Sequence, residues 1–225
     1  MNNFLQLKNI SKNFDTEKKV RVLNRLSYNF KLGKVYSLMG PSGSGKSTLL
    51  NLISLIDRPT NGSIKFNNIQ VNFNENNRND IYRAKKIGIV YQQNNLLPDF
   101  TALENLYLAS LSIYDNKKMA MIKAEKLLKK IGLSNRSDHL PSQLSGGESQ
   151  RIAIARAIIN DPDIILADEP TGSLDMKTAE NIFALLNNQK KPNRLIIFAT
   201  HNRFFAKKAD YLLELNDGSI KSTDA

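Results

Sequence analysis

The 225-residue sequence contains no cysteine, which excludes disulfide bonds and thiolate metal sites. It also has no apolar run near the roughly 18–20 residues that a membrane-spanning helix needs. Residues 1–8 show no apolar signal-peptide region. We therefore expect a soluble chain, large enough for one domain with an inserted subdomain, in which any membrane role comes through a partner.

Dense blocks of Lys and Arg are also missing, although the formal net charge is +11. A charge of this size suggests a surface for nucleic acid or for an anionic membrane. However, the lysines are spread along the whole chain and do not alternate regularly with aromatic residues. We therefore favour a compositional bias, in which part of the charge offsets nucleotide phosphates or acidic lipid headgroups, and we expect no specific nucleic-acid partner.

Apolar patterns predict two kinds of strand. Alternating apolar and polar residues, typical of half-buried antiparallel strands, occur at 4–10 and 20–30. Short continuous apolar runs, typical of parallel strands buried on both faces, occur at 35–39, 87–91, 164–167 and 195–199. A short strand is predicted at 63–66, and a closing hairpin at 211–221. The antiparallel sheet should lie next to the loop that follows residue 39.

Helical periodicity is concentrated in the middle of the chain. Helices are predicted at 49–55, 81–85, 103–112, 117–131, 148–159 and 178–188, and the polar, Asn-rich residues 72–79 are predicted to form an exposed loop. No strand pattern interrupts residues 92–160. We therefore predict an α/β fold whose core comprises residues 1–91 and 161–225, with an α-helical subdomain inserted at 92–160.

A glycine-rich loop follows the predicted strand at 35–39 and fits the pattern G-x-x-x-x-G-K-[ST] of a phosphate-binding P-loop. Its glycines allow backbone N–H groups to wrap around phosphate, and the next helix adds the positive end of its dipole. Lys46 is predicted to reach the β- and γ-phosphates, and the Ser47 hydroxyl to bind Mg²⁺. The alternative is a Gly/Ser turn that ends in Lys by chance. The predicted nucleotide-binding residues are Gly40, Pro41, Ser42, Gly43, Ser44, Gly45, Lys46, Ser47 and Thr48.

Two carboxylates follow the apolar run at 164–167. Asp168, at the tip of the predicted strand, is expected to reach Mg²⁺ directly or through water. Glu169 is expected to polarise the water that attacks the phosphate. An acidic turn after a strand is the alternative, and the P-loop in the same chain argues against it.

A second phosphate-type cradle is predicted at Leu144-Ser145-Gly146-Gly147-Glu148, just before the helix at 148–159. Ser and Gly at a helix N-terminus present a hydroxyl and backbone N–H groups to an anion. The alternative is a helix cap with Ser145 as the N-cap residue. A cap accounts for the serine, but it does not explain why one chain should contain two such cradles.

These motifs, in their order, resemble those of ABC-type ATPases over essentially the whole chain. Gln92, the segment Ser173-Leu174-Asp175 and His201 complete the set. The resemblance implies a P-loop NTPase (RecA-like) core with an antiparallel β subdomain and an α-helical subdomain. It also implies hydrolysis of ATP with Mg²⁺ by a head-to-tail homodimer.

The same resemblance implies roles for single residues. ATP would lie between the P-loop of one copy and Ser145, Gly146 and Gly147 of the other, and Asp175 would reach across the dimer. Gln92 would contact Mg²⁺ or the attacking water, His201 would hydrogen-bond the γ-phosphate, and Phe14 would stack on adenine. A polar histidine without a ligand and a core aromatic are the respective alternatives for His201 and Phe14. Ser149, Ser173 and Asn202 depart from common family choices without removing a group of known chemical role.

Residues 91–106 are very similar to the corresponding stretch in the LolD/MacB/FtsE branch of this family, and within it to ATPases of bacterial lipoprotein-releasing complexes. Integral membrane permease subunits, LolC/LolE-like, would dock near residues 92–106. The resemblance implies a peripheral subunit on the cytoplasmic face of the inner membrane that drives lipoprotein release. A MacB-like exporter and an FtsE-like cell-division complex are alternatives. A nucleic-acid-associated ABC ATPase is a further one, but the chain has none of the coiled coils, zinc modules or tandem ATPase halves usual there.

Overall fold

A computed structural model of the chain describes residues 3–15, 19–113 and 116–223. In these ranges the strands are β1 (Asn3–Asp15), β2 (Lys19–Lys31), β3 (Val35–Met39), β4 (Asn61–Phe66), β5 (Ile69–Gln70), β6 (Ile87–Val90), β7 (Ile164–Asp168), β8 (Leu195–Ala199), β9 (Tyr211–Asn216) and β10 (Ser219–Thr223). The helices are α1 (Lys46–Ile53), α2 (Asn76–Lys86), α3 (Ala102–Leu111), α4 (Lys117–Lys130), α5 (Gly146–Ile158), α6 (Met176–Asn187) and α7 (Arg203–Ala206), with short 3₁₀ helices at Ser134–Arg136 and Pro141–Gln143.

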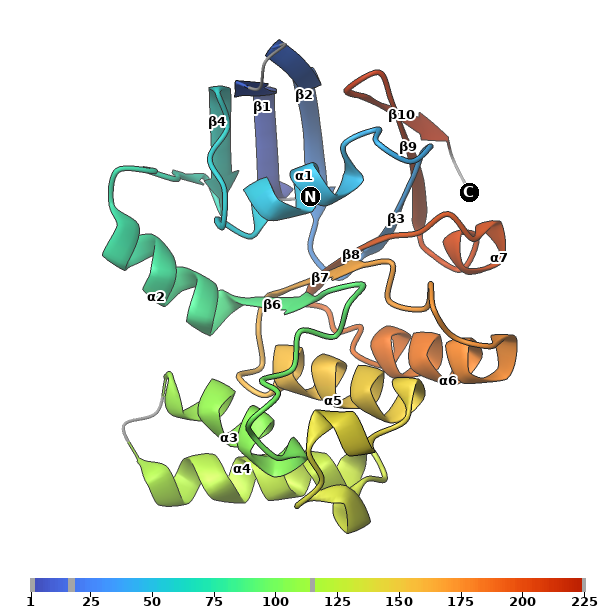
Figure 1. The fold of residues 1–225 in the computed structure, drawn as a ribbon. Helices are drawn as coiled ribbons and strands as arrows, with labels where there is room; N and C mark the ends of the chain where they lie inside the picture. Colours follow the sequence, from blue (N-terminus) through green and yellow to red (C-terminus); the bar gives the residue numbers. More distant parts are fainter. Residues whose placement is uncertain (1–2, 16–18, 114–115, 224–225) are drawn as a thin grey trace.

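The strands form two sheets, as the two apolar patterns predicted. One is antiparallel in the order β2-β1-β4-β5, and the other has the order β10-β9-β3-β8-β7-β6. In the second sheet β9, β3, β8, β7 and β6 run parallel, and β10 closes the predicted hairpin with β9. Figure 1 shows the antiparallel sheet at the top of the molecule, with α1 between it and the parallel strands.

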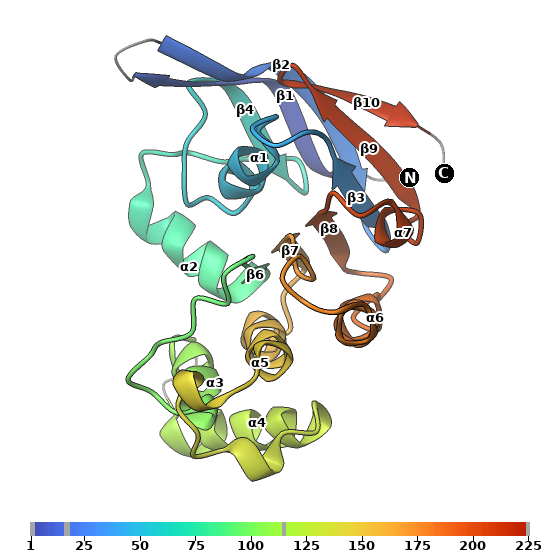
Figure 2. The ribbon, with the colours of Figure 1, turned by 45° about the vertical axis from the view of Figure 1, so that its right-hand side comes forward.

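The parallel sheet is buried on both faces, and successive side chains of each strand point alternately into the two cores. In β7, Ile164 and Leu166 pack into the core shared with α1 and the antiparallel sheet, whereas Ile165 and Ala167 pack against α5 and α6. In β8, Leu195 and Ile197 divide in the same way from Ile196 and Phe198. Figure 2 shows α1 on one side of these strands and α5 and α6 on the other.

The helices α3, α4 and α5 gather at the end of the molecule opposite the antiparallel sheet (Figure 1). They enclose an apolar core of their own, which includes Leu106 of α3, Leu128 of α4 and Ile152 of α5. The other face of α5 packs on the parallel sheet through Ile154 and Ile158. This helix therefore links the helical part of the chain to the sheet.

The loop predicted at 72–79 is wrong in its second half, because α2 begins at Asn76. Asparagine has low helix propensity, and the segment offers few apolar residues from which a periodicity can be read. Contacts that a short window does not reveal stabilise the helix. Tyr82 stacks on Phe66 of β4 with a ring-centroid distance of 5.2 Å. A local, exposed ion pair of 3.1 Å between Glu75 and Arg78 lies at the start of the helix.

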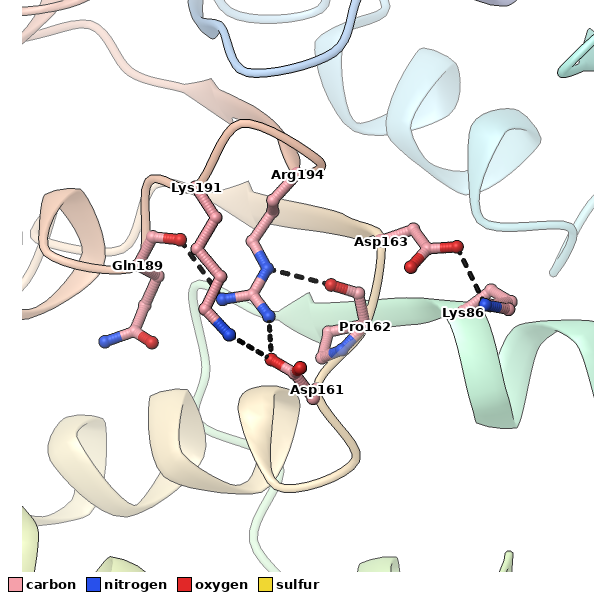
Figure 3. Close-up of polar contacts among 7 residues, drawn as sticks. All are labelled: Lys86, Asp161, Pro162, Asp163, Gln189, Lys191 and Arg194. Carbon is pink, nitrogen blue, oxygen red and sulfur yellow. Dashed lines mark hydrogen bonds and ion pairs between the residues drawn. The ribbon is translucent and has the colours of Figure 1, made fainter.

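A buried arginine joins the two loops that enter β7 and β8, and Figure 3 shows its contacts. The Arg194 guanidinium donates to the carbonyls of Pro162 at 2.8 Å and Gln189 at 3.1 Å, and it pairs with Asp161. Hydrogen bonds from Lys191 and Arg194 hold the pKa of Asp161 below its usual range. These contacts fix the amino ends of β7 and β8 relative to each other.

Candidate active site

A cavity of about 500 Å³ opens where the carboxyl ends of β3, β7 and β8 meet, the usual position for a ligand on a parallel sheet. Residues from four predicted motifs line it together with one strand residue that the motifs did not indicate. The lining residues are Val22, Gly40, Ser42, Gly43, Gly45, Lys46, Ser47, Thr48, Gln92, Asp168, Glu169 and His201. The fold thus brings together Gln92, the carboxylate pair, His201 and the predicted P-loop residues except Pro41 and Ser44, which do not line the cavity.

The P-loop has a shape that only glycine permits at two positions. Gly40 has φ 151°, and a Cβ added there would lie 2.3 Å from the Leu215 carbonyl oxygen. Gly45 has φ 99°, and its Cβ would lie 2.9 Å from Val22 Cγ1. The loop is therefore packed between the β9 end and β2, and its backbone can approach a phosphate closely.

Lys46 is held over this loop from the first position of α1. Its Nζ donates to the carbonyl of Gly40 at 2.8 Å and to that of Pro41 at 3.0 Å. An ammonium group has three N–H donors, so a third remains for a ligand oxygen. Together with the N-terminus of α1, the cation makes the cavity suited to an anion.

Glu169 and His201 both line the cavity and contact each other. The His201 Nδ1 lies 3.0 Å from Glu169 Oε2, and the His201 backbone N–H donates to the same oxygen at 3.4 Å. Glu169 has φ 45°, a backbone conformation that is costly for a residue with a Cβ and that aims its side chain into the site. Its own N–H donates to the Ala199 carbonyl at 3.0 Å, which ties it to the end of β8.

The oxygen donors in the cavity fit Mg²⁺. Ser47 supplies a hydroxyl, Gln92 an amide and Asp168 a carboxylate, and all three line the same space. Mg²⁺ usually binds through one or two carboxylates together with substrate phosphates and water. Among the described residues, there is no group of three or more His, Cys, Asp or Glu side chains that could hold a metal ion. The donor set therefore suits a metal ion that arrives with a nucleotide.

Ser145 is the N-cap residue of α5, which is the alternative interpretation of the predicted second cradle. Its hydroxyl accepts from the Glu148 N–H at 3.3 Å, and Glu148 accepts from the Ser145 N–H at 2.8 Å. A hydroxyl that accepts a hydrogen bond still carries its own proton, so the Ser145 hydroxyl can also donate to a ligand. Gly147 packs tightly, because a Cβ there would lie 2.6 Å from Thr178 Cγ2.

Three groups of predicted residues lie apart from the P-loop cavity. Ser145, Gly146 and Gly147 are not among its lining residues, and neither is Asp175. Asp175 is exposed and caps α6 by accepting from the Thr178 N–H at 3.1 Å. Hydrogen bonds from the Thr178 side chain and from the Thr178 backbone N–H lower the pKa of Asp175. Phe14 lies on β1, 40% exposed, with the Lys12 Nζ 5.0 Å from its ring centroid. The predicted roles of these residues in nucleotide binding stay predictions.

Val22 lines the cavity, although no sequence motif predicts it. Its alternation within 20–30 indicated a half-buried strand residue, but no motif marks the point at which β2 crosses the P-loop. The crossing depends on long-range contacts, such as the hydrogen bond of 3.0 Å from the Asn24 N–H to the Gly218 carbonyl in the β9–β10 turn. Spacing along the sequence carries no signal for such a contact.

The Glu148 carboxylate should make the stability of the chain depend on pH. It pairs with Arg136 at 2.9 Å, and the hydrogen bonds from Ser145 and Arg136 lower its pKa to about 2. Glu148→Gln keeps a capping acceptor but loses the charge, so we expect it to lower the free energy of unfolding by about 1–2 kcal/mol at pH 7. Urea unfolding of both proteins measures this difference.

The sign of the effect is set by the lowered pKa. Stabilisation by the Glu148 charge is fully present above the unfolded-state pKa of about 4.3, and it is lost as the pH falls toward 2. The gap between wild type and Glu148→Gln should therefore close in this window. Glu75→Gln, the same change in an exposed ion pair, should lower the free energy of unfolding much less than Glu148→Gln does. A gap for Glu148→Gln that stays constant from pH 7 to pH 3 would contradict the assignment.

The fold and cavity define a P-loop nucleoside triphosphatase, and comparison with known proteins gives the family. Residues 23–172 match the family model described as "ABC transporter". The chain is 43% identical over 221 residues to the lipoprotein-releasing system ATP-binding protein LolD of Rickettsia bellii. This alignment covers 97% of this chain and 98% of that protein. An uncharacterized ABC transporter ATP-binding protein of Bacillus subtilis, YvrO, is 42% identical over 217 residues, 96% of this chain and 95% of that protein.

The structural comparison agrees. A dimeric structure of the ATP-binding cassette MJ0796 bound to ADP and phosphate, in a post-hydrolysis state, matches with a TM-score of 0.90 and 38% identity over 98% of both chains. The chain therefore belongs to the ABC transporter ATP-binding family. It is an ATPase of that family and the ATP-binding subunit of a transporter, as the motifs predicted. In the part of the chain that the structure describes, no helix is long and apolar enough to cross a membrane.

Proposed function

We propose that this chain is the ATP-hydrolysing subunit of a complex that releases lipoproteins from the bacterial inner membrane for transfer to the outer membrane. The observation that carries the proposal is the near-full-length similarity to proteins named LolD from several bacteria, at 40–44% identity. Overall identity alone does not separate this role from others, because YvrO is 42% identical. The resemblance of residues 91–106 to the lipoprotein-releasing branch supplies the additional support.

In the proposed reaction, the P-loop N–H groups and Lys46 bind the β- and γ-phosphates and stabilise the charge that develops on the transferred group. Glu169 orients the attacking water, and His201, held by its contact with Glu169, donates to the γ-phosphate. Ser47, Gln92 and Asp168 would hold Mg²⁺, which supplies further charge neutralisation when bound. Each of these groups reaches the same cavity in the fold.

We further propose that two copies assemble head to tail. Ser145, Gly146, Gly147 and Asp175 lie outside the P-loop cavity of their own chain, and the hydroxyl proton of Ser145 is available to a ligand. A partner copy would bring these groups to the nucleotide and complete the site, with Phe14 against the adenine. The described dimer of MJ0796, which is 39% identical to this chain, supports such an arrangement.

The surface proposed to receive the permease is the segment between β6 and α3. Leu97 and Phe100 are 42% and 39% exposed. The buried Asn105 fixes the segment, because its side chain accepts from the Leu97 N–H at 2.8 Å and donates to the Phe100 carbonyl at 3.0 Å. Two apolar side chains on a rigid support make a suitable contact for a permease helix. The ATPase would then be peripheral, on the cytoplasmic face of the membrane.

In this proposal residues 92–160 act as a subdomain that moves relative to the core formed by residues 1–91 and 161–225. The separate apolar core of α3, α4 and α5 supports this division. Closure of the dimer on ATP, and reopening after hydrolysis, would move the permease through the segment that carries Leu97 and Phe100.

Purification of the tagged chain from membranes tests the role directly. We expect permease subunits of the LolC/LolE type to co-purify, and the purified complex to release a lipoprotein from proteoliposomes when ATP is supplied. Leu97→Asp with Phe100→Asp should abolish co-purification and leave the ATPase activity of the isolated chain within about twofold, since neither side chain lines the cavity. Met119→Asp, a similar change at an exposed residue of α4, should retain the permease. Recovery of a MacB-like or FtsE-like partner instead would contradict lipoprotein release but not the ATPase assignment.

A further inference from the structure

Arg156 connects the helix that begins at the second cradle to the segment that follows Gln92. It lies in the last turns of α5, and its guanidinium Nη2 donates to the Asn94 carbonyl at 2.9 Å. Its Nη1 donates to the Asn95 carbonyl at 2.7 Å. One planar guanidinium thus donates hydrogen bonds to two consecutive backbone carbonyls, which lie two and three residues after Gln92.

The gripped backbone has an unusual shape. Asn95 has φ 45°, in the left-handed region, and the Asn94 Oδ1 is buried without a hydrogen-bond partner. Asparagine tolerates left-handed backbone better than most residues, but the conformation still needs support from its surroundings. The two bonds from Arg156 provide that support, so they fix the direction in which the chain leaves Gln92.

The cavity beside Arg156 offers its guanidinium no unpaired carboxylate, so the guanidinium bonds to the two carbonyls instead. It borders a cavity of about 440 Å³, whose other charged or titratable lining groups are Asp80, Arg83 and Tyr91. Asp80 is already paired with Arg83 at 2.8 Å. Burial lowers the pKa of Arg156 and raises that of Tyr91, and a neutral phenol offers no opposing charge. A forked guanidinium suits two neighbouring carbonyls, a geometry that the single ammonium of lysine does not reproduce.

The helix α5 connects Arg156, near its C-terminal end, to Ser145 at its N-terminus. Ser145 caps its first turn and Arg156 lies ten residues beyond Gly146, a distance of about 15 Å along a rigid helix. Gln92 lines the P-loop cavity. A shift of α5 therefore displaces the backbone of Asn94 and Asn95, and through it Gln92.

We propose that Arg156 is a positioning residue for ATP hydrolysis, which makes Gln92 move together with the helix that carries Ser145, Gly146 and Gly147. The site on the P-loop and the second cradle are thereby linked within one chain. This inference rests on the proposed role of Gln92 in the reaction, and it does not depend on the cargo or the permease.

The test is a double-mutant cycle on the full chain, read as kcat for ATP hydrolysis and Kd for ATP. Arg156→Met should lower kcat about tenfold, because a small misplacement of a catalytic group is costly, and should leave Kd within about twofold. Arg151→Met is the matched control, since Arg151 lies on the same helix and donates to the Ile131 carbonyl at 3.5 Å, away from the Gln92 segment. It should keep kcat within about twofold.

The cycle with Gln92→Ala distinguishes positioning from a merely structural role. If Arg156 acts through Gln92, the double variant should be no slower than Gln92→Ala alone. Multiplied effects, or an Arg156→Met enzyme with wild-type kcat, would overturn the inference. An unchanged kcat for Gln92→Ala would instead remove the proposed role of Gln92 itself. Should Arg156→Met fail to fold, Arg156→Lys replaces it in the same cycle, with the same non-additivity expected.

Discussion

Lys46→Ala should weaken ATP binding by roughly 10- to 150-fold, the equivalent of about 1.5–3 kcal/mol for hydrogen bonds that involve a charged group. The Lys46 ammonium is fixed at the mouth of the cavity by the carbonyls of Gly40 and Pro41. Alanine removes both the charge and the remaining N–H donor that would meet the phosphates. Binding of a fluorescent ATP analogue, titrated against the full chain, measures the loss.

The control for this variant is Lys85→Ala, which removes the same charge from an exposed position on α2 outside the cavity lining. It should bind ATP within about twofold of wild type. Thermal unfolding without nucleotide should be nearly the same for both variants, because the carbonyls that Lys46 contacts belong to a solvent-accessible loop. Unchanged affinity in Lys46→Ala would rule out the P-loop as the phosphate site.

Glu169→Gln should reduce kcat by about 10²–10⁴-fold while ATP still binds, since the loss of a general base has an effect of this size. The amide has the volume of the carboxylate and can still accept from the His201 N–H, so the site should keep its shape. What it loses is the charge that orients and polarises water. Steady-state phosphate release and equilibrium ATP binding separate the two effects.

Glu180→Gln makes the identical chemical change on the exposed face of α6 and should leave kcat within about twofold. A Glu169→Gln enzyme with more than about a tenth of wild-type turnover would move the assignment of the base to another group. His201→Ala would then be the next variant, because the His201 Nδ1 lies 3.0 Å from Glu169 Oε2.

The strands, the P-loop and the cap of α5 could be predicted because each depends on a local sequence pattern. Continuous apolar runs gave the parallel strands because both faces of that sheet are covered, by α1 on one side and by α5 and α6 on the other. Fixed residue types at fixed spacing gave the P-loop, where the backbone of Gly40 admits no side chain. Even the cap on α5 was available from sequence, as the alternative interpretation of Ser145.

The parts that the sequence did not reveal depend on contacts between distant segments. Val22 lines the cavity because β2 is held by the β9–β10 turn, nearly 200 residues further along. The start of α2 was missed because tertiary contacts such as the stacking of Tyr82 on Phe66 outweigh a poor helix propensity. Arg156 belongs to no motif considered, and only the fold places its guanidinium against Asn94 and Asn95.

The central claim is that one chain holds two half-sites that are completed by a second copy. The most direct measurement is the molar mass of the Glu169→Gln variant by light scattering, with and without Mg²⁺ and ATP. Because we expect this variant to bind ATP and to hydrolyse it at most slowly, the account predicts a shift from one chain mass of 25.4 kDa to twice that mass when ATP saturates the site. A Glu169→Gln protein that binds ATP and keeps the mass of a single chain would contradict the claim.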